Sequence, residues 1–247
     1  MVRWRQERVS AESEWPQARK DACMCGRFSL FADGEEVAAA LGLAAPPFLA
    51  PRYNVAPTQP VAAVRLKAGS AERELTHFYW GLIPGWAKDP SLASRMINAR
   101  AETVADKPAF RAAFKYRRCL IPASGFYEWR KLDGQKQPMH IQPADAPLFA
   151  LAGLWEHWVS PDGSEIDSCA ILTTDANERV RPIHDRMPVI LLPEDYDTWL
   201  DPHAPPVVLH SLLKPYPPER LTAVAVGPLV NSPRNDSAEL IRPIAES

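Results

Sequence analysis

The sequence predicts a single α+β domain that is rich in β-strands and carries its helices at the periphery. Short apolar segments typical of strands outnumber the segments with helical periodicity. The 26 prolines against 11 glycines indicate many short elements with stiff connections, because proline fixes φ and cannot donate a hydrogen bond inside a helix or sheet. A chain of 247 residues with 46% hydrophobic residues can bury a core without disulfides.

The first half of the chain predicts strands and one well-capped helix. "GRFSLF" has strand-like apolar spacing, and in the "DGEEVAAALGL" that follows Asp33 is a helix cap and Gly42 marks the helix end. The proline-rich residues 46–60 predict a loop. Residues 61–66 and "RELTHFYWGLIP" predict two strands that pair as a hairpin.

The second half continues the β-rich pattern. A short helix is expected around residues 108–116, then a strand at 118–122 and a hairpin that turns at "LDGQ". "LFALAGLWEHWV" and "DSCAILTTDA" predict strands. "NERVRPIHDRMPVILL" begins as a turn and ends as an apolar strand, and "PEDYDTWL" and "VVLHSLLK" predict surface helices.

Composition limits the function classes. The formal charge of −2 gives no global argument for nucleic acid, so a case for DNA rests on local charge. The four cysteines form no C-x-x-C pair, and we expect neither a metal nor a cofactor. Without an apolar N-terminal run or a segment of membrane-spanning length, we expect a cytoplasmic monomer with no membrane contact.

Residues 1–23 differ from the rest, with five basic and four acidic side chains and few large apolar ones. Met24 is followed at once by a plausible domain, so we interpret residues 1–23 as sequence upstream of the true start and 24–247 as the domain. Removal of an initiator methionine requires a small second residue, and cysteine is small. A removed propeptide is the alternative interpretation of this extension.

A cysteine at position one differs chemically from an internal cysteine, because its thiol stands beside a free α-amine. That amine has a reference pKa near ~8 and condenses with an aldehyde to a Schiff base. The thiol can then close a five-membered thiazolidine ring. The other interpretation of Cys25 is a buried structural cysteine at the head of a strand, which is the more frequent case for an arbitrary cysteine.

Six segments decide between these interpretations. They are "MCGRF", "RYNVAPTQ", "WGLIPGW", "INARAET", "GFYEW" and "IHDRMPVIL". In this order they resemble the SOS response-associated peptidase (SRAP) family, whose members act on abasic sites in single-stranded DNA, and the resemblance runs from Met24 to about residue 244. It implies a β-rich, barrel-like α+β fold with a positively charged DNA groove, and peptidase and abasic-site lyase activities besides covalent capture of the sugar.

The resemblance implies four catalytic residues. The family's N-terminal cysteine matches Cys25, its asparagine Asn98, its glutamate Glu128 and its histidine His184. A carboxylate beside the amine can accept and return protons, and an imidazole can protonate the ring oxygen of the sugar. Asn98 can orient the amine or the sugar. Each has a plain structural alternative: Glu128 pairing with Arg130, His184 with Asp185, and Asn98 capping a turn.

A basic segment provides the local charge that DNA binding needs. Residues 95–131 hold nine basic and three acidic side chains, among several aromatic residues. We expect Trp80 and Trp129 in the core and Trp86, after "PG", as a stacking residue. By resemblance, Arg27 and Arg100 contact phosphates, and the remaining DNA-path positions are Asn54, Pro57 and Thr173.

Two other function classes remain open from the sequence. A cysteine hydrolase would activate Cys25 through His184 and would need no free α-amine, and self-removal of residues 1–24 is a related hypothesis. A non-catalytic module would bind single-stranded DNA reversibly, with Cys25 structural. "PASGFYEW" is not a G-x-S-x-G elbow, so a serine hydrolase finds no support.

Overall fold

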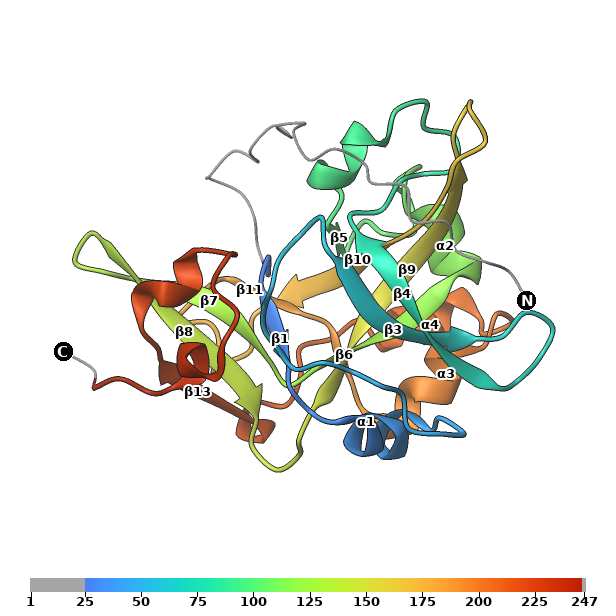
Figure 1. Cartoon of the computed structure of the whole chain (residues 1–247). Helices are drawn as coiled ribbons and strands as arrows, with labels where there is room; N and C mark the ends of the chain where they lie inside the picture. The colour runs from blue at the N-terminus through green and yellow to red at the C-terminus, as the bar shows by residue number, and fades with distance from the viewer. Residues whose placement is uncertain (1–24, 246–247) are drawn as a thin grey trace.

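A closed five-stranded barrel forms the centre of the fold (Figure 1). The computed structural model describes residues 25–245, so the N-terminal extension and Met24 lie outside the described residues. The barrel runs from β10 (Glu165–Asp175) through β4 (Arg73–Trp80), β3 (Pro60–Leu66), β6 (Arg118–Ala123) and β9 (Phe149–Val159) back to β10. Only β10 and β4 pair in parallel within this ring.

Short strands extend the barrel at one end. β5 (Asn98–Arg100) and β11 (Arg186–Pro188) both pair with the last part of β10, and β12 (Ile190–Leu191) pairs with the first part of β9. β5 pairs with β10 in the parallel sense at residues 171–173, just past its contact with β4. This arrangement gathers three chain segments at the end of β10.

A second sheet of five strands packs beside the barrel, on the left in Figure 1. Its order is β13 (Leu221–Ala225), β8 (Gln135–Pro143), β7 (Gly125–Leu132), β1 (Phe28–Leu30) and β2 (Arg52–Val55). The β7–β8 hairpin turns at Asp133 and Gly134, with φ of 48° and 81°, as a two-residue loop with both central residues left-handed requires. The predicted "LDGQ" turn is therefore confirmed.

The helices are short and peripheral. They are α1 (Gly34–Leu41), α2 (Arg111–Tyr116), α3 (Tyr196–Leu200), α4 (Pro206–Ser211) and the 3₁₀ turns η1 (Pro90–Arg95), η2 (Pro193–Asp195), η3 (Pro218–Arg220), η4 (Pro228–Asn231) and η5 (Ala238–Ile241). Asp33 and Glu36 form a capping box at the start of α1, and Gly42 ends it with φ of 64°. The single α+β domain and its barrel-like core are confirmed.

Three strands were not predicted. Residues 52–55 were expected within a loop, but they form β2, whose backbone pairs with β1. The three residues of β5 and the five of β13 also form strands. All three pair with strands distant in the sequence, which local apolar periodicity does not reveal. The helix expected from Pro108 begins at Arg111.

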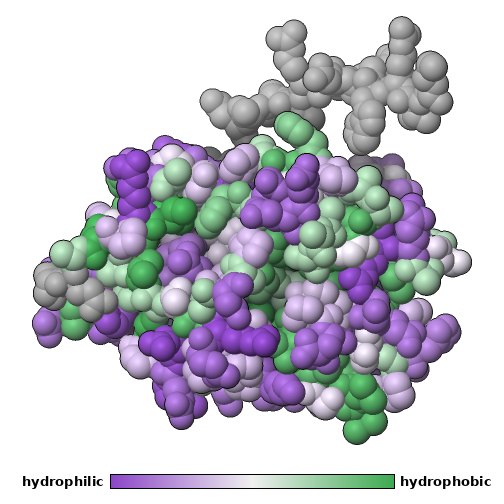
Figure 2. Space-filling view, turned by 90° about the horizontal axis from the view of Figure 1, so that it is seen from below, coloured by the Kyte–Doolittle hydropathy of each residue, from purple (hydrophilic) through white to green (hydrophobic). Residues whose placement is uncertain are grey.

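One hydrophobic core fills the barrel and reaches under the helices. Trp80, Phe78, Leu120 and Ile141 have no exposed surface. On the face shown in Figure 2, hydrophobic side chains lie in small separate groups among hydrophilic ones, as on ordinary protein surfaces.

Within residues 25–245, no helix has the length and apolar character to cross a membrane. The same residues contain no cluster of three His, Cys, Asp or Glu side chains that could hold a metal ion.

Candidate active site

Pairing of β1 with β7 brings Cys25 against Glu128. Phe28 lies opposite Phe126, and Tyr127 N donates to Arg27 O at 2.9 Å. Because the strands are antiparallel, continuing this register places the residues just before Arg27 beside Glu128. The sheet therefore joins two residues that are 103 positions apart in the chain.

Glu128 bonds both reactive atoms of Cys25. The main-chain nitrogen of Cys25 donates to Glu128 Oε1 at 2.7 Å, and the Cys25 thiol also hydrogen-bonds this carboxylate. Both residues are buried, at 4% and 3% exposure. Cys25 has φ of 47°, a left-handed conformation that is uncommon for a non-glycine residue and is often kept at functional sites.

The environment of Glu128 favours its neutral form. Burial raises the pKa of Glu128 above the usual glutamate range, against the opposing influence of nearby His184 and of the hydrogen bonds from Cys25. A carboxyl group held in this way can take up and release a proton closer to neutral pH than an exposed glutamate can. This is the property required of a general acid/base.

His184 stands at the end of a tight turn that an asparagine organises. The Asn177 side-chain oxygen accepts hydrogen bonds from Arg179 N at 3.1 Å and Val180 N at 3.0 Å. The Val180 carbonyl in turn accepts from His184 N at 2.9 Å. The Asn177 amide is tied to Tyr216 O at 2.6 Å, so the turn is anchored to the body of the domain.

Asn98 and Arg100 reach the same end of the barrel on β5. Asn98 lies opposite Ile171 and Arg100 opposite Thr173 in the β10 register. Asn98 is half-buried, and Arg100 is exposed. Both residues therefore lie at the end of β10 that also pairs with β11, the strand that begins two residues after His184.

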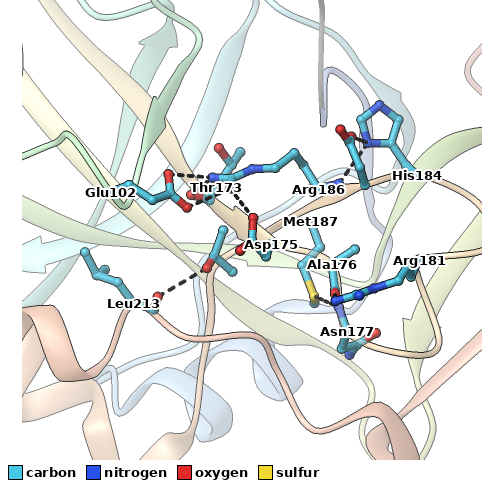
Figure 3. Close-up of polar contacts among 12 residues, drawn as sticks. Glu102, Thr173, Asp175, Ala176, Asn177, Arg181, His184, Arg186, Met187 and Leu213 are labelled. Atoms are coloured by element: carbon cyan, nitrogen blue, oxygen red, sulfur yellow. Dashed lines mark hydrogen bonds and ion pairs between the residues drawn. The ribbon is translucent and has the colours of Figure 1, made fainter.

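An ion-pair cluster that the sequence did not reveal links this strand to the His184 turn (Figure 3). The Arg186 guanidinium bonds both oxygens of Glu102, at 2.6 and 2.9 Å, and also Asp175 at 2.6 Å. Its second terminal nitrogen donates to Thr173 O at 2.8 Å. Thr173 and Asp175 lie on β10, whereas Glu102 follows β5, so no local pattern in the sequence indicated the cluster.

The predicted DNA-path residues fall into two groups. Arg27 lies with its guanidinium 5.9 Å from the Trp129 ring centre, and Trp86 is 62% exposed. Asn54, by contrast, has no exposed surface: its amide donates to Ser232 O at 2.9 Å and Asn235 O at 2.7 Å, and its oxygen accepts from Arg27. Asn54 thus holds the Arg27 guanidinium in place through a partly buried hydrogen bond.

The remaining two DNA-path residues are also covered in part. Pro57 is half-buried in the segment after β2. Thr173 is fully buried, and within residues 25–245 its hydroxyl has no hydrogen-bond partner. A buried hydroxyl without a partner costs free energy, so a ligand or water that reached it would restore a hydrogen bond.

Not all of the basic segment is available to DNA. Arg118 is 3% exposed, and its nitrogens donate to the main-chain oxygens of Trp199, Phe114 and Asp201. Arg117 pairs with Glu156 at 2.6 Å. The number of basic residues counted along this segment is therefore larger than the number that lie exposed on the surface. The six exposed basic residues are Arg95, Arg100, Lys107, Arg111, Lys115 and Lys131.

The burial of the aromatic residues in this region agrees with the prediction only in part. Trp80 has no exposed surface, as predicted, and Phe126 is buried at 1%. Trp129 is half-buried, and its indole N–H donates to Asn231 Oδ1 at 2.7 Å. The prediction that Trp129 lies in the core is therefore only partly correct. Trp86 and Tyr116 remain exposed and can stack on a base.

The chain is similar to proteins of one family over most of its length. The family model "SOS response associated peptidase (SRAP)" matches residues 24–233. "Abasic site processing protein YoqW" of Bacillus subtilis (strain 168) is 46% identical over 225 residues, covering 88% of this chain and 99% of that protein. "Abasic site processing protein HMCES" of Xenopus tropicalis is 34% identical over 224 residues, covering 78% of this chain and 66% of that protein.

A solved structure shares the fold. An X-ray structure of a protein from Bacteroides thetaiotaomicron superposes with a TM-score of 0.80 at 29% identity, covering 90% of this chain and 100% of that one. The match includes the barrel and the second sheet, because it extends over nearly all of the described residues. The chain therefore belongs to the SOS response associated peptidase family.

Proposed function

We propose that this protein processes abasic sites in single-stranded DNA and captures the opened sugar covalently through Cys25. The relatives named abasic site processing proteins support the general activity. The observation that supports the covalent step is the buried Glu128 carboxylate, bonded to both the nitrogen and the thiol of Cys25. A structural cysteine has no need of a carboxylate at both of these atoms.

The chemistry requires a free amine on Cys25, produced by removal of Met24 or of residues 1–24. The amine attacks the sugar aldehyde, and Glu128 relays one amine proton to the alkoxide oxygen, giving a carbinolamine. Glu128 then takes the second proton of the nitrogen and gives it to the departing hydroxyl, and water leaves as the imine forms. The thiol sulfur then adds to the imine carbon, and the thiol proton moves to the imine nitrogen. The product is a thiazolidine, and one water is lost in total.

Different surface residues would contact the phosphates, bases and sugar of the DNA. Arg27, stacked on Trp129 and braced by Asn54, and exposed Arg100 would contact phosphates. Trp86 would stack on an unpaired base. Asn98, on the strand that carries Arg100, would orient the sugar or the amine, and Pro57 and Thr173 would border the strand path.

Self-removal of the N-terminal segment is a second candidate activity. Glu128 accepts a hydrogen bond from the nitrogen of the peptide bond that such a cleavage would break, and the Cys25 thiol stands beside it. The left-handed φ of Cys25 is an unfavourable backbone conformation immediately next to that bond. A variant carrying Cys25→Ala would then retain residues 1–24, whereas a protein started at Met24 would need no cleavage.

The test uses two proteins released from a fusion partner by a site-specific protease. One begins at Cys25, and the other has a single glycine before Cys25, which leaves the thiol intact. Each is incubated with single-stranded DNA carrying one abasic site and run on a denaturing gel. We expect a cross-link only with free Cys25. Equal cross-linking by both would refute the aminothiol mechanism, and reversible binding without a cross-link would favour a binding module.

A further inference from the structure

The chain after β13 folds back over the second sheet, where it is drawn in red in Figure 1. Residues 228–236, which we name the C-terminal clasp, contain η4 and the turn that follows it. Val230 of the clasp has no exposed surface and packs in a small core with Tyr127 and Leu240. Apolar packing therefore anchors the middle of the clasp to the sheet.

The end of the clasp is tied to β2 by an aspartate. Asp236 Oδ1 accepts hydrogen bonds from the main-chain nitrogens of Tyr53 at 2.5 Å and Asn54 at 3.1 Å. The other oxygen of Asp236 pairs with Arg52 at 2.5 Å. The Asn54 side chain in turn donates to two carbonyls of the clasp. A polar anchor thus adds to the apolar one, and together they fix the main chain of the clasp.

The clasp supplies one of two acceptors that hold the Arg27 guanidinium. Arg27 Nη1 donates to Val230 O and to Asn54 Oδ1, both at 2.7 Å. A terminal nitrogen of arginine carries two protons, so these two bonds use both of them. Both acceptors are uncharged, and they therefore hold the guanidinium in place without neutralising its charge. An arginine charge of this kind can bind a phosphate.

The next residue of the clasp holds the aromatic ring beside Arg27. The guanidinium carbon lies 5.9 Å from the centre of the Trp129 ring, within the range of a cation–π contact. The Trp129 indole N–H donates to Asn231 Oδ1 at 2.7 Å. An indole has no other polar atom, so this bond restricts the orientation of the half-buried ring. Val230 and Asn231, which are adjacent in the chain, thus hold the two members of the Arg27–Trp129 pair.

We propose that Asn231 is a positioning residue for DNA binding: it orients the Trp129 ring, and the ring and the clasp hold the Arg27 guanidinium where a DNA phosphate binds. This inference rests on the proposed function, in which Arg27 contacts a phosphate. Arg27 follows Cys25 by only two residues, so a phosphate bound there brings the neighbouring sugar near the nucleophile. Loss of the Asn231 amide lowers the affinity for DNA and leaves the chemical step unchanged.

The first test measures binding of undamaged single-stranded DNA by fluorescence anisotropy, with the full chain and its variants. Asn231→Ala is compared with Gln135→Ala, which removes an exposed amide at the start of β8 in the same sheet. We expect Asn231→Ala to bind about 3- to 10-fold more weakly, the effect of one hydrogen bond. The control should bind like the parent protein, and both variants should melt at the parent's temperature. Equal affinity of Asn231→Ala and the parent overturns the proposal.

Two further variants show whether Asn231 acts through the ring and the guanidinium. Trp129→Phe keeps an aromatic face but has no indole N–H, and Arg27→Gln removes the charge. In either background Asn231→Ala should have no further effect on affinity, because the contact that it supports is already absent. Arg27→Gln should also lower the slope of log affinity against log salt by about 0.7, the value for one phosphate of a single strand. An Asn231→Ala loss that persists in either background overturns the proposal.

Cross-linking kinetics separate this inference from the proposed function. With protein beginning at Cys25 and single-stranded DNA carrying an abasic site, Asn231→Ala should raise the half-saturating DNA concentration by the same factor and leave the maximal rate unchanged. A lower maximal rate at unchanged half-saturation overturns the positioning role. If the parent protein bound DNA but formed no cross-link, the covalent mechanism would fail, and the binding measurements would still decide the role of Asn231. A parent without affinity for single-stranded DNA would overturn both.

Discussion

Glu128 Oε1 lies 2.7 Å from the main-chain nitrogen of Cys25, in a place where both side chains are almost fully buried. A carboxylate in such a place is unfavourable for stability, because burial penalises its charged form. The same burial raises the pKa of Glu128, so the group exchanges its proton closer to neutral pH than an exposed glutamate does. Stability and chemistry therefore place opposite demands on this residue.

Glu128→Gln should be more stable than the parent protein at pH 8. Because the pKa of Glu128 is raised in the folded state, its stabilising effect is present below the unfolded pKa and is lost as pH rises through the folded value. Glutamine keeps an acceptor for Cys25 and never ionises. Thermal unfolding should show a gain of about 2–4 °C at pH 8, or about 1 kcal/mol, and almost none at pH 4.5.

The same variant should cross-link about 100-fold more slowly or worse, since general acid/base groups contribute at least this factor. Glu178→Gln, which removes an exposed charge, is the control for both measurements. A Glu128→Gln protein that lost stability at pH 8 would show that the carboxylate is a structural ion and not a strained catalytic group.

Substitutions of Cys25 separate the two steps of capture. Cys25→Ala retains an amine but no thiol, and Cys25→Ser retains an amine with a hydroxyl that closes the ring poorly. We expect both to bind single-stranded DNA like the parent protein and to give no stable cross-link, although borohydride should trap an imine with either. A stable cross-link formed by Cys25→Ala without reductant would exclude the thiazolidine.

Trp86→Ala should weaken non-covalent DNA binding without destabilising the fold. Trp86 is 62% exposed, and stacking of one base on an aromatic ring contributes about 1–3 kcal/mol. Fluorescence anisotropy with a labelled single strand should therefore show a loss of about 5- to 100-fold. Phe48→Ala, which removes an aromatic ring that is 97% exposed, is the matched control. Equal losses in both variants would mean that neither ring has a specific role.

His140 should make the domain less stable in acid. It has no exposed surface, its Nε2 lies 2.9 Å from Ser29 Oγ, and burial lowers its pKa from 6.5 to about 4. The unfolded chain therefore binds a proton that the folded chain excludes, and stability falls as pH drops from 6.5 to 4. The loss is at most about 3 kcal/mol.

Chemical denaturation across this pH range checks the effect. His140→Gln should flatten the dependence, and His203→Gln, at an exposed position, should not. The ring of His140 also explains why residue 125 is a glycine: a Cβ there would stand 2.3 Å from His140 Nε2. An unchanged pH slope in His140→Gln would place the titrating group elsewhere.

The parts of the fold that were predictable depend on local chemistry. Asp33 and Gly42 bracket α1, and Asp133–Gly134 turns the β7–β8 hairpin, because caps and turns are formed by residues close together in the chain. The strand of residues 52–55 was missed because prolines at 51, 57 and 60 surround it. It exists through its pairing with β1.

The candidate site was predictable only as separate residues. Only the family resemblance implied that the Glu128 carboxylate lies beside the nitrogen of Cys25, since the contact depends on strand register, which the residues around Glu128 do not indicate. The Arg186–Glu102 pair was missed for the same reason. Charge counted along the chain also placed Arg118 with the DNA-binding residues, although its guanidinium is buried against three carbonyls.

The most direct test of the central claim is an intact mass of the protein from its native host, before and after incubation with single-stranded DNA carrying one abasic site. The covalent mechanism predicts a chain that begins at Cys25 and gains the mass of the DNA minus one water. A chain that retains residues 1–23 and gains no mass would contradict it, because Cys25 would then have no free amine.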